Sequence, residues 1–185
     1  MQYPSKIKFH AIPISINGIS YFSIIIFDIN RLGISDSFEA GKSLTLGIDY
    51  KREKVDTGKY MEFKVGTVLR DKIENKISSA STIDEKFSNL IGSVYSDLGD
   101  IFEFNYNYSI NTDAKTLEYN SLGATMSLNN FKTEIKFVEE NGDIGDANTL
   151  ESNFSYKIDE NNYLTFGTRR NRKIGLTEYY DLIYE

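Results

Sequence analysis

Apolar and polar residues alternate along most of this chain of 185 residues, and this alternation constrains the fold more than any other feature. The segment 101–110 shows it most clearly, since every even position is aromatic or aliphatic and most odd positions are polar. A period of two puts alternate side chains on opposite faces of a β-strand, whereas a helix would scatter them around its axis. The sequence therefore predicts an all-β protein built from two-faced strands.

We expect about ten strands, most of them nine to eleven residues long. Their ranges are 22–30, 42–52, 59–69, 87–96, 101–110, 116–128, 131–139, 149–158, 162–170 and 176–185. The mean strand of a soluble protein has about 5–6 residues, whereas a tilted strand that crosses a bilayer has about 9–11. Strand length therefore favours a membrane β-barrel over a soluble β protein.

The connections between these strands alternate in length. If the strands form a meander, the longer loops share one edge of the sheet: 31–41, 70–86, 111–115, 140–148 and 171–175. The other edge then carries only shorter turns, rich in Asn, Asp and Gly: 53–58, 97–100, 129–130 and 159–161. Outer-membrane barrels have the same asymmetry, with long loops outside the cell and short turns in the periplasm.

Composition excludes several other classes of protein. The chain holds 21 Lys and Arg against 27 Asp and Glu, and this acidic balance argues against nucleic-acid binding. It has no Cys and one His, His10, so thiolate and His-based metal sites are absent from the sequence. No apolar run approaches the ~18 residues of a membrane helix, and no catalytic motif is found. We expect no catalytic residue, no metal and no cofactor, and we do not expect an enzyme.

Two charged segments near the end of the chain have alternative interpretations. The acidic loop 139–146 is either a solvated loop or a calcium site, although its spacing is not that of an EF-hand. The basic cluster 169–173 is either balanced by Glu178, Asp181 and Glu185 or contacts phosphates of lipid headgroups. A third polar patch, around residues 30–41, is more typical of packing than of ligand binding.

Two sequence motifs resemble a known family. The first has the pattern N-R-x-x-x-x-D-x-x-E-x-G followed by T-x-G-x-x-Y, and its matching residues are Asn30, Arg31, Asp36, Glu39, Gly41, Thr45, Gly47 and Tyr50. The second lies in 168–185, with Arg169, Arg170, Asn171, Arg172, Glu178, Tyr179, Tyr180 and Asp181. Both resemble the barrel of the LPS-assembly outer-membrane protein LptD, the organic solvent tolerance protein, of the alphaproteobacterial type.

This resemblance implies a role in the outer membrane of a Gram-negative bacterium, where the family inserts lipopolysaccharide into the outer leaflet. It implies as partners lipopolysaccharide, outer-membrane lipid, an LptE-like plug lipoprotein and the periplasmic Lpt bridge, all through the full-length parent. Residues 27–185 correspond to a C-terminal part of the barrel without its terminal strands, whereas 1–26 match poorly. We therefore expect an antiparallel up-and-down meander that is a section of a large transmembrane β-barrel, a fragment with no apolar core of its own.

The alternation also predicts which residues face the lumen of such a barrel and which face lipid. The lumen-facing residues are expected to be Glu103, Asn105, Asn107, Lys132, Glu134, Lys136, Glu151, Asn153 and Lys157. The lipid-facing residues are expected to be Phe102, Phe104, Tyr106, Tyr108, Phe131, Ile135, Phe137, Leu150, Phe154 and Tyr156. Alternatives are a porin or receptor barrel, a soluble extracellular β-sheet binding protein whose aromatic stripes form a sandwich core, and, more weakly, a β-rich enzyme.

Overall fold

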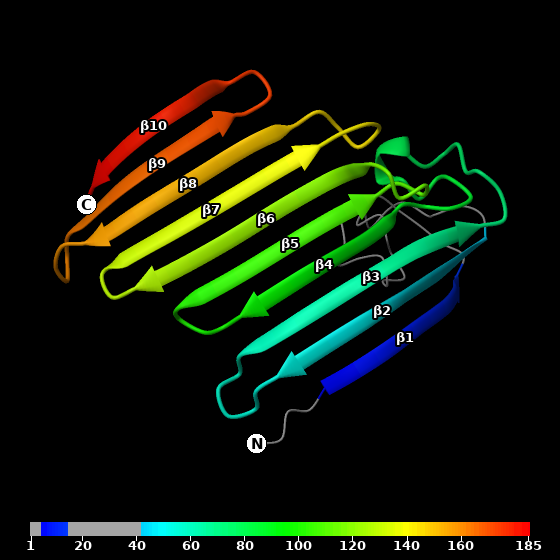
Figure 1. Cartoon of the computed structure of the whole chain (residues 1–185), viewed down its shortest axis with the longest axis horizontal. Helices are drawn as coiled ribbons and strands as arrows, with labels where there is room; N and C mark the ends of the chain where they lie inside the picture. Colours follow the sequence, from blue (N-terminus) through cyan, green and yellow to red (C-terminus); the bar gives the residue numbers. More distant parts are fainter. Residues whose placement is uncertain (1–4, 15–41) are drawn as a thin grey trace.

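The computed structural model describes residues 5–14 and 42–185, and in them the chain forms one antiparallel sheet of ten strands in sequence order (Figure 1). The strands are β1 (Ser5–Ile14), β2 (Ser43–Glu53), β3 (Tyr60–Arg70), β4 (Leu90–Asp97), β5 (Phe102–Ile110), β6 (Leu117–Leu128), β7 (Phe131–Glu140), β8 (Asn148–Lys157), β9 (Tyr163–Asn171) and β10 (Leu176–Tyr184). One 3₁₀ turn, η2 (Ser79–Ser81), interrupts the β3–β4 loop. The predicted all-β meander is therefore confirmed.

The predicted strands from 42–52 onward correspond to β2 through β10, with boundaries that differ by three residues or fewer. The predicted strand 22–30 lies outside the described residues. Strand β1 was not expected, because the N-terminal segment alternates less regularly and contains Pro13. The backbone of β1 pairs with β2 from Ser5 opposite Arg52 to Ile14 opposite Ser43. As the first strand of the described sheet, β1 tolerates a proline, which lacks a backbone donor.

The described connections have the predicted asymmetry of length. Loops 71–89, 111–116, 141–147 and 172–175 lie at one edge, which we call the loop edge, at the upper right of the sheet in Figure 1. Turns 54–59, 98–101, 129–130 and 158–162 lie at the opposite edge, the turn edge. The shortest, 129–130, places Asn129 at a φ of 51°, a left-handed conformation that Asn tolerates better than most residues.

Register gives the sheet two chemically distinct faces. On one face Tyr106 lies opposite Val94 and Leu122, and the same row continues to Phe137 and Leu150. We call this the apolar face and the opposite one the polar face. Extra residues in β6 and β10, Glu118 and Glu178, form bulges that keep this alternation in step with the neighbouring strands.

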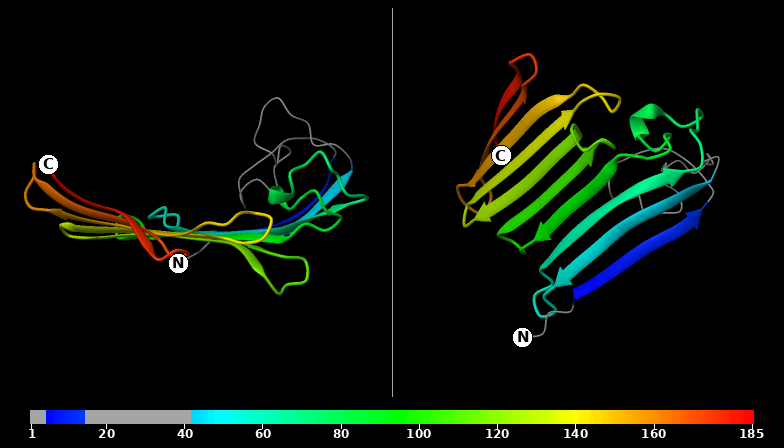
Figure 2. Two further views of the ribbon diagram at one scale, coloured as in Figure 1. Left: turned by 90° about the horizontal axis from the view of Figure 1, so that it is seen from above. Right: turned by 45° about the vertical axis from the view of Figure 1, so that its right-hand side comes forward.

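The apolar face has no second layer over it in the described part of the chain. Seen edge-on, the sheet is a single curved layer (Figure 2). Large side chains on this face remain substantially accessible even in central strands, with Phe131 39% and Phe154 37% exposed. Aromatic pairs cover the backbone here, as between Phe131 and Phe154 (6.4 Å between centroids) and between Tyr106 and Tyr108 (5.8 Å).

A small apolar core lies on the polar face, contrary to the expectation of no apolar core. Loop 71–89 folds back over β3 and β4, and its Ile77 and Ile83 form a buried cluster with Val68 and Ile91. The Arg70 side chain is also buried here, and its Nε donates to the carbonyl of Ile83. The sequence did not predict this core because Val68 and Ile91 occupy positions in the alternation that are polar elsewhere.

Candidate functional site

The polar face gathers all nine residues that the sequence predicts on one side of the sheet. Register places Glu103 opposite Thr125, and Thr125 opposite Glu134. Asn105 and Lys136 flank Gly123 in the next row. The remaining predicted residues of this face continue the same alternation: Asn107, Lys132, Glu151, Asn153 and Lys157.

Six of these residues line one open groove of ≈ 360 Å³, which we call the polar groove: Glu103, Asn105, Glu134, Lys136, Glu151 and Asn153. Its floor is Gly123, directly opposite Asn105. A Cβ at Gly123 would collide with the Asn105 Oδ1, so the asparagine side chain leans over the glycine. Asn153 and Gly167 repeat this arrangement, with the Asn153 Oδ1 2.8 Å from where a Cβ would lie. Glycine thus gives the groove its depth and space for the amides.

Charges in and beside the groove are partly paired on the same face. Lys132 and Glu134 form an ion pair of 2.5 Å along β7. The Tyr95 hydroxyl donates to the Glu103 Oε1 at 2.7 Å. Lys136 and Glu151 lie directly opposite each other in register. The groove therefore offers carboxylates, amides and an ammonium group to a polar or hydroxyl-rich solute.

Asn105, Lys136 and Glu151 of the groove belong to a row of residues that runs across the polar face of the sheet. From β3 to β9 its register positions are Glu62, Tyr95, Asn105, Gly123, Lys136, Glu151 and Arg169. Opposite charges alternate in its second half, which limits repulsion between neighbouring strands. A solute on this face meets a line of hydrogen-bonding side chains that runs across the strands and is interrupted at Gly123.

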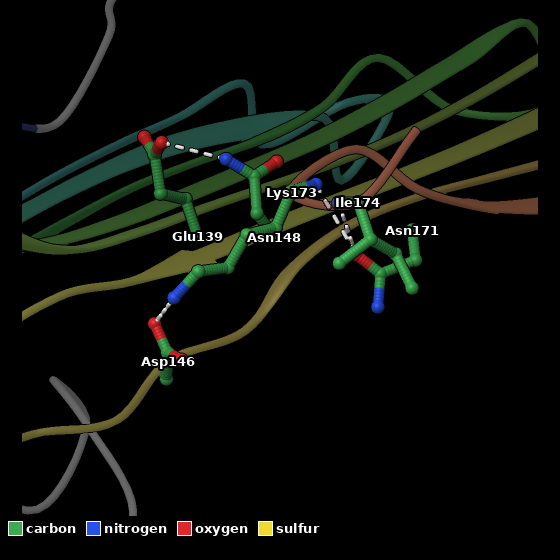
Figure 3. Close-up of polar contacts among 6 residues, drawn as sticks. All are labelled: Glu139, Asp146, Asn148, Asn171, Lys173 and Ile174. Carbon is green, nitrogen blue, oxygen red and sulfur yellow. Dashed lines mark hydrogen bonds and ion pairs between the residues drawn. The ribbon is translucent and has the colours of Figure 1, made fainter. Parts of the chain in front are cut away.

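The structure also brings together the two charged segments near the chain end (Figure 3). Lys173, in the loop after β9, forms an ion pair with Asp146 of the acidic loop. Across the same gap the Arg172 backbone N donates to the Asn148 carbonyl at 2.7 Å, and the Asn148 side-chain amide donates to Glu139 at 2.9 Å. In the described residues no group of three or more His, Asp or Glu side chains could hold a metal ion.

The motif residues of this segment divide between the two faces. On the polar face Arg169 forms an ion pair of 3.0 Å with Glu178, next to Tyr179 and Asp181. On the apolar face Tyr180 stacks against Phe166 at 6.4 Å, and Arg170 lies opposite Leu150.

At the end of β9 the Asn171 side chain accepts from the Lys173 backbone N at 3.1 Å and so holds the turn. The predicted motif residues Asn30, Arg31, Asp36, Glu39 and Gly41 lie outside the described residues.

Sequence reasoning missed a buried polar network near the loop edge. The Asn89 side-chain amide donates to the Ser109 hydroxyl at 2.9 Å and to the Glu118 carboxylate at 2.6 Å. The register shift of the β5–β6 pair leaves Glu118 as an extra residue next to Tyr119, which lies opposite Ser109, and alternation alone does not locate such a bulge. The one available signal is Asn89 itself, a polar residue just before the apolar pair Leu90-Ile91.

Comparison with models of known protein families and with curated protein sequences gives no match for this chain. In the described part of the chain, no helix has the length and apolar character needed to cross a membrane.

Proposed function

We propose that this chain is a section of an outer-membrane β-barrel, with its apolar face toward lipid and its polar face toward a water-filled lumen. The supporting observation is the position of charge on the apolar face. Outside the bulges of β2–β10, only Arg52, Glu139 and Arg170 bring a charge to that face. Each is the second-last residue of its strand, so the central zone carries none.

The energetics of hydrocarbon explain this distribution. An Arg or Lys at the bilayer midplane of a barrel costs roughly 2–4 kcal/mol, and the cost falls to about 0–1 kcal/mol near the interfaces. A solvated sheet face has no reason to exclude charge from its centre while accepting it at both ends. The polar face has no such restriction and carries charged residues at its centre, including Lys136 and Glu151.

Strand length agrees with a membrane crossing. At about 3.4 Å per residue, a ten-residue strand is about 34 Å long. A tilt of about 40° reduces its height to about 26 Å, close to the ~25 Å apolar band of such barrels. Strands β7 and β8 each have 10 residues. In this orientation the loop edge faces the outside of the cell and the turn edge faces the periplasm.

The finer proposal is that the parent protein is an LptD-like translocon that inserts lipopolysaccharide into the outer leaflet. The two sequence motifs support it, since they resemble that family on residues 30–50 and 168–185. The polar groove and the polar row suit the sugar–phosphate part of an amphipathic lipid, while the acyl chains remain on the apolar side. An LptE-like plug and the periplasmic Lpt bridge are the partners that this proposal implies for the full-length protein.

Lysine substitutions at adjacent residues test the orientation of the sheet. We expect Phe104→Lys and Phe154→Lys to abolish most insertion of the full chain into phosphatidylcholine vesicles, because each puts a charge in hydrocarbon. Asn105→Lys, on the polar face, is the matched control and should insert like the wild type. Insertion is measured as the fraction that resists an alkaline wash. The opposite pattern, or a chain that is fully soluble without lipid, would contradict the proposal.

A second arm of the same experiment tests the lipid. A photo-crosslinker at Asn153 in the polar groove should trap purified lipopolysaccharide, whereas one at Phe154 on the apolar face should trap phospholipid. Equal yields of lipopolysaccharide at both positions would contradict the translocon proposal but would not contradict the proposal of a barrel section.

A further inference from the structure

The basic cluster 169–173 divides into neutralised and uncompensated charges. Arg169 is paired with Glu178, and Lys173 is paired with Asp146. Arg170 has no carboxylate partner in the described part of the chain, and neither does Arg172. The two arginines that remain uncompensated are also the two that lie on the apolar side of the sheet.

Backbone register fixes that side. Arg170 lies between Leu150 of β8 and Thr177 of β10, in the apolar row that includes Phe137. Arg172 follows two residues later, where its backbone N still pairs with Asn148, and its guanidinium lies 5.2 Å from the centroid of the Phe137 ring. Both side chains are exposed. Two residues along a strand span about 7 Å, so the guanidinium groups start from neighbouring positions on one face.

We infer that Arg170 and Arg172 together bind the phosphate of a lipid headgroup at the loop edge. This inference rests on the proposed function, which places the apolar face against lipid. Arginine presents a planar fork of donors that matches phosphate oxygens in a bidentate manner. The Arg172 guanidinium lies within cation–π distance of the Phe137 ring, and the Arg172 side chain is exposed to a ligand.

The surroundings favour a lipid over a free anion. Below the arginines, toward the membrane centre, the same face presents Leu150, Ile135 and Phe154, which suit acyl chains. Glu139, the carboxylate nearest in register, is already bound by the Asn148 amide. A ligand that carries a phosphate above an apolar body therefore satisfies both parts of the surface.

Binding of a fluorescent phosphatidic acid to the full chain in dodecyl maltoside micelles tests the site. We expect Arg170→Gln and Arg172→Gln each to weaken binding about tenfold, in line with a lost charge-assisted hydrogen bond. The double variant should bind no better than it binds diacylglycerol, which lacks the phosphate. Lys173→Gln is the matched control in the same cluster and should stay within about twofold of the wild type.

The outcomes separate this inference from the proposed function. Equal losses in Lys173→Gln and Arg170→Gln would show a general charge effect and overturn the inference. Displacement of the lipid by millimolar inorganic phosphate would show a free-phosphate site and also overturn it. Each variant is inserted into phosphatidylcholine vesicles as well. If the Arg170 and Arg172 variants insert normally and bind phosphatidic acid as the wild type does, the phosphate site alone is refuted. If the wild type fails to insert, the barrel is refuted.

Discussion

At the scale of single residues, the sheet pairs a bulky side chain with a glycine across the strands on both faces. Tyr108 covers Gly92 on the apolar face, where a Cβ would collide with its ring. Asn105 covers Gly123 on the polar face. Glycine weakens a strand because it has no side chain to pack, and the cross-strand neighbour covers the backbone that the glycine leaves open. Such pairs depend on register, so single-sequence alternation does not reveal them.

The turn residue Asp159 provides a prediction about pH. The backbone N–H of Asn161 donates to its carboxylate at 2.9 Å, and this bond is the main reason that the pKa of Asp159 lies below its ordinary value of 3.8. The Asn162 amide adds to the effect. Because the folded-state pKa is lowered, the stabilisation is present above pH 3.8 and is lost as pH falls through the folded-state pKa.

Carboxyl-carbon NMR titration of Asp159 in the full chain checks this prediction. We expect Asn162→Ala to move the pKa of Asp159 part of the way back toward the ordinary value. Asn161→Gly keeps the backbone donor and should leave that pKa low. A larger change in the pKa of Asp159 in Asn161→Gly than in Asn162→Ala would contradict the prediction that the Asn162 amide, and not the Asn161 side chain, lowers that pKa.

At the scale of elements, the strands were predictable because each repeats one simple rule over many residues. Strand β5 has five apolar residues in strict alternation, and its predicted and observed ends differ by one residue at most. Strand β1 was not predicted, because Pro13 and the short alternation of this segment are typical of irregular structure. The loop core was not predicted, because Ile77 and Ile83 are separated by polar residues in loop 71–89. They contact Val68 only because this loop folds back over the sheet.

The loop core gives a prediction about loop 71–89. Ile83→Ala should release the loop from the polar face, since Ile→Ala in a core costs about 2–5 kcal/mol and this cluster has few members. A cost of about 2 kcal/mol raises the open population roughly thirtyfold. Trypsin cleavage at Lys76 should accelerate accordingly while strand content stays constant. Ile73→Ala, in the same loop but 48% exposed, is the control and should leave the cleavage rate unchanged.

At the scale of the whole molecule, the candidate site was predicted as a face but not as a groove. Alternation alone assigned the nine polar residues to one side, because it needs no knowledge of partners. Their convergence into one groove depends on register, which places Gly123 between Asn105 and Lys136. The pairing of the acidic loop with Lys173 likewise needs the order of strands β7 to β9.

The height of the apolar band makes a prediction about bilayers. Mismatch between protein and hydrocarbon thickness costs fractions of a kcal/mol per Å. The full chain should therefore insert to a greater extent in bilayers with a hydrocarbon core of about 25 Å than in bilayers of about 33 Å. The inserted fraction after an alkaline wash measures this difference. A preference for the thicker bilayer would be incompatible with the proposed tilt and strand length.

The strict order of the strands has a consequence for how the sheet is built. Every strand pairs with its neighbours in sequence, so the contacts that hold the sheet join segments that are close along the chain. Loop-closure entropy is then low for a β protein, and contact order predicts comparatively fast pairing. The sheet can lengthen one hairpin at a time. During such growth each moving edge exposes a single row of unpaired backbone groups, which limits the surface available for aggregation.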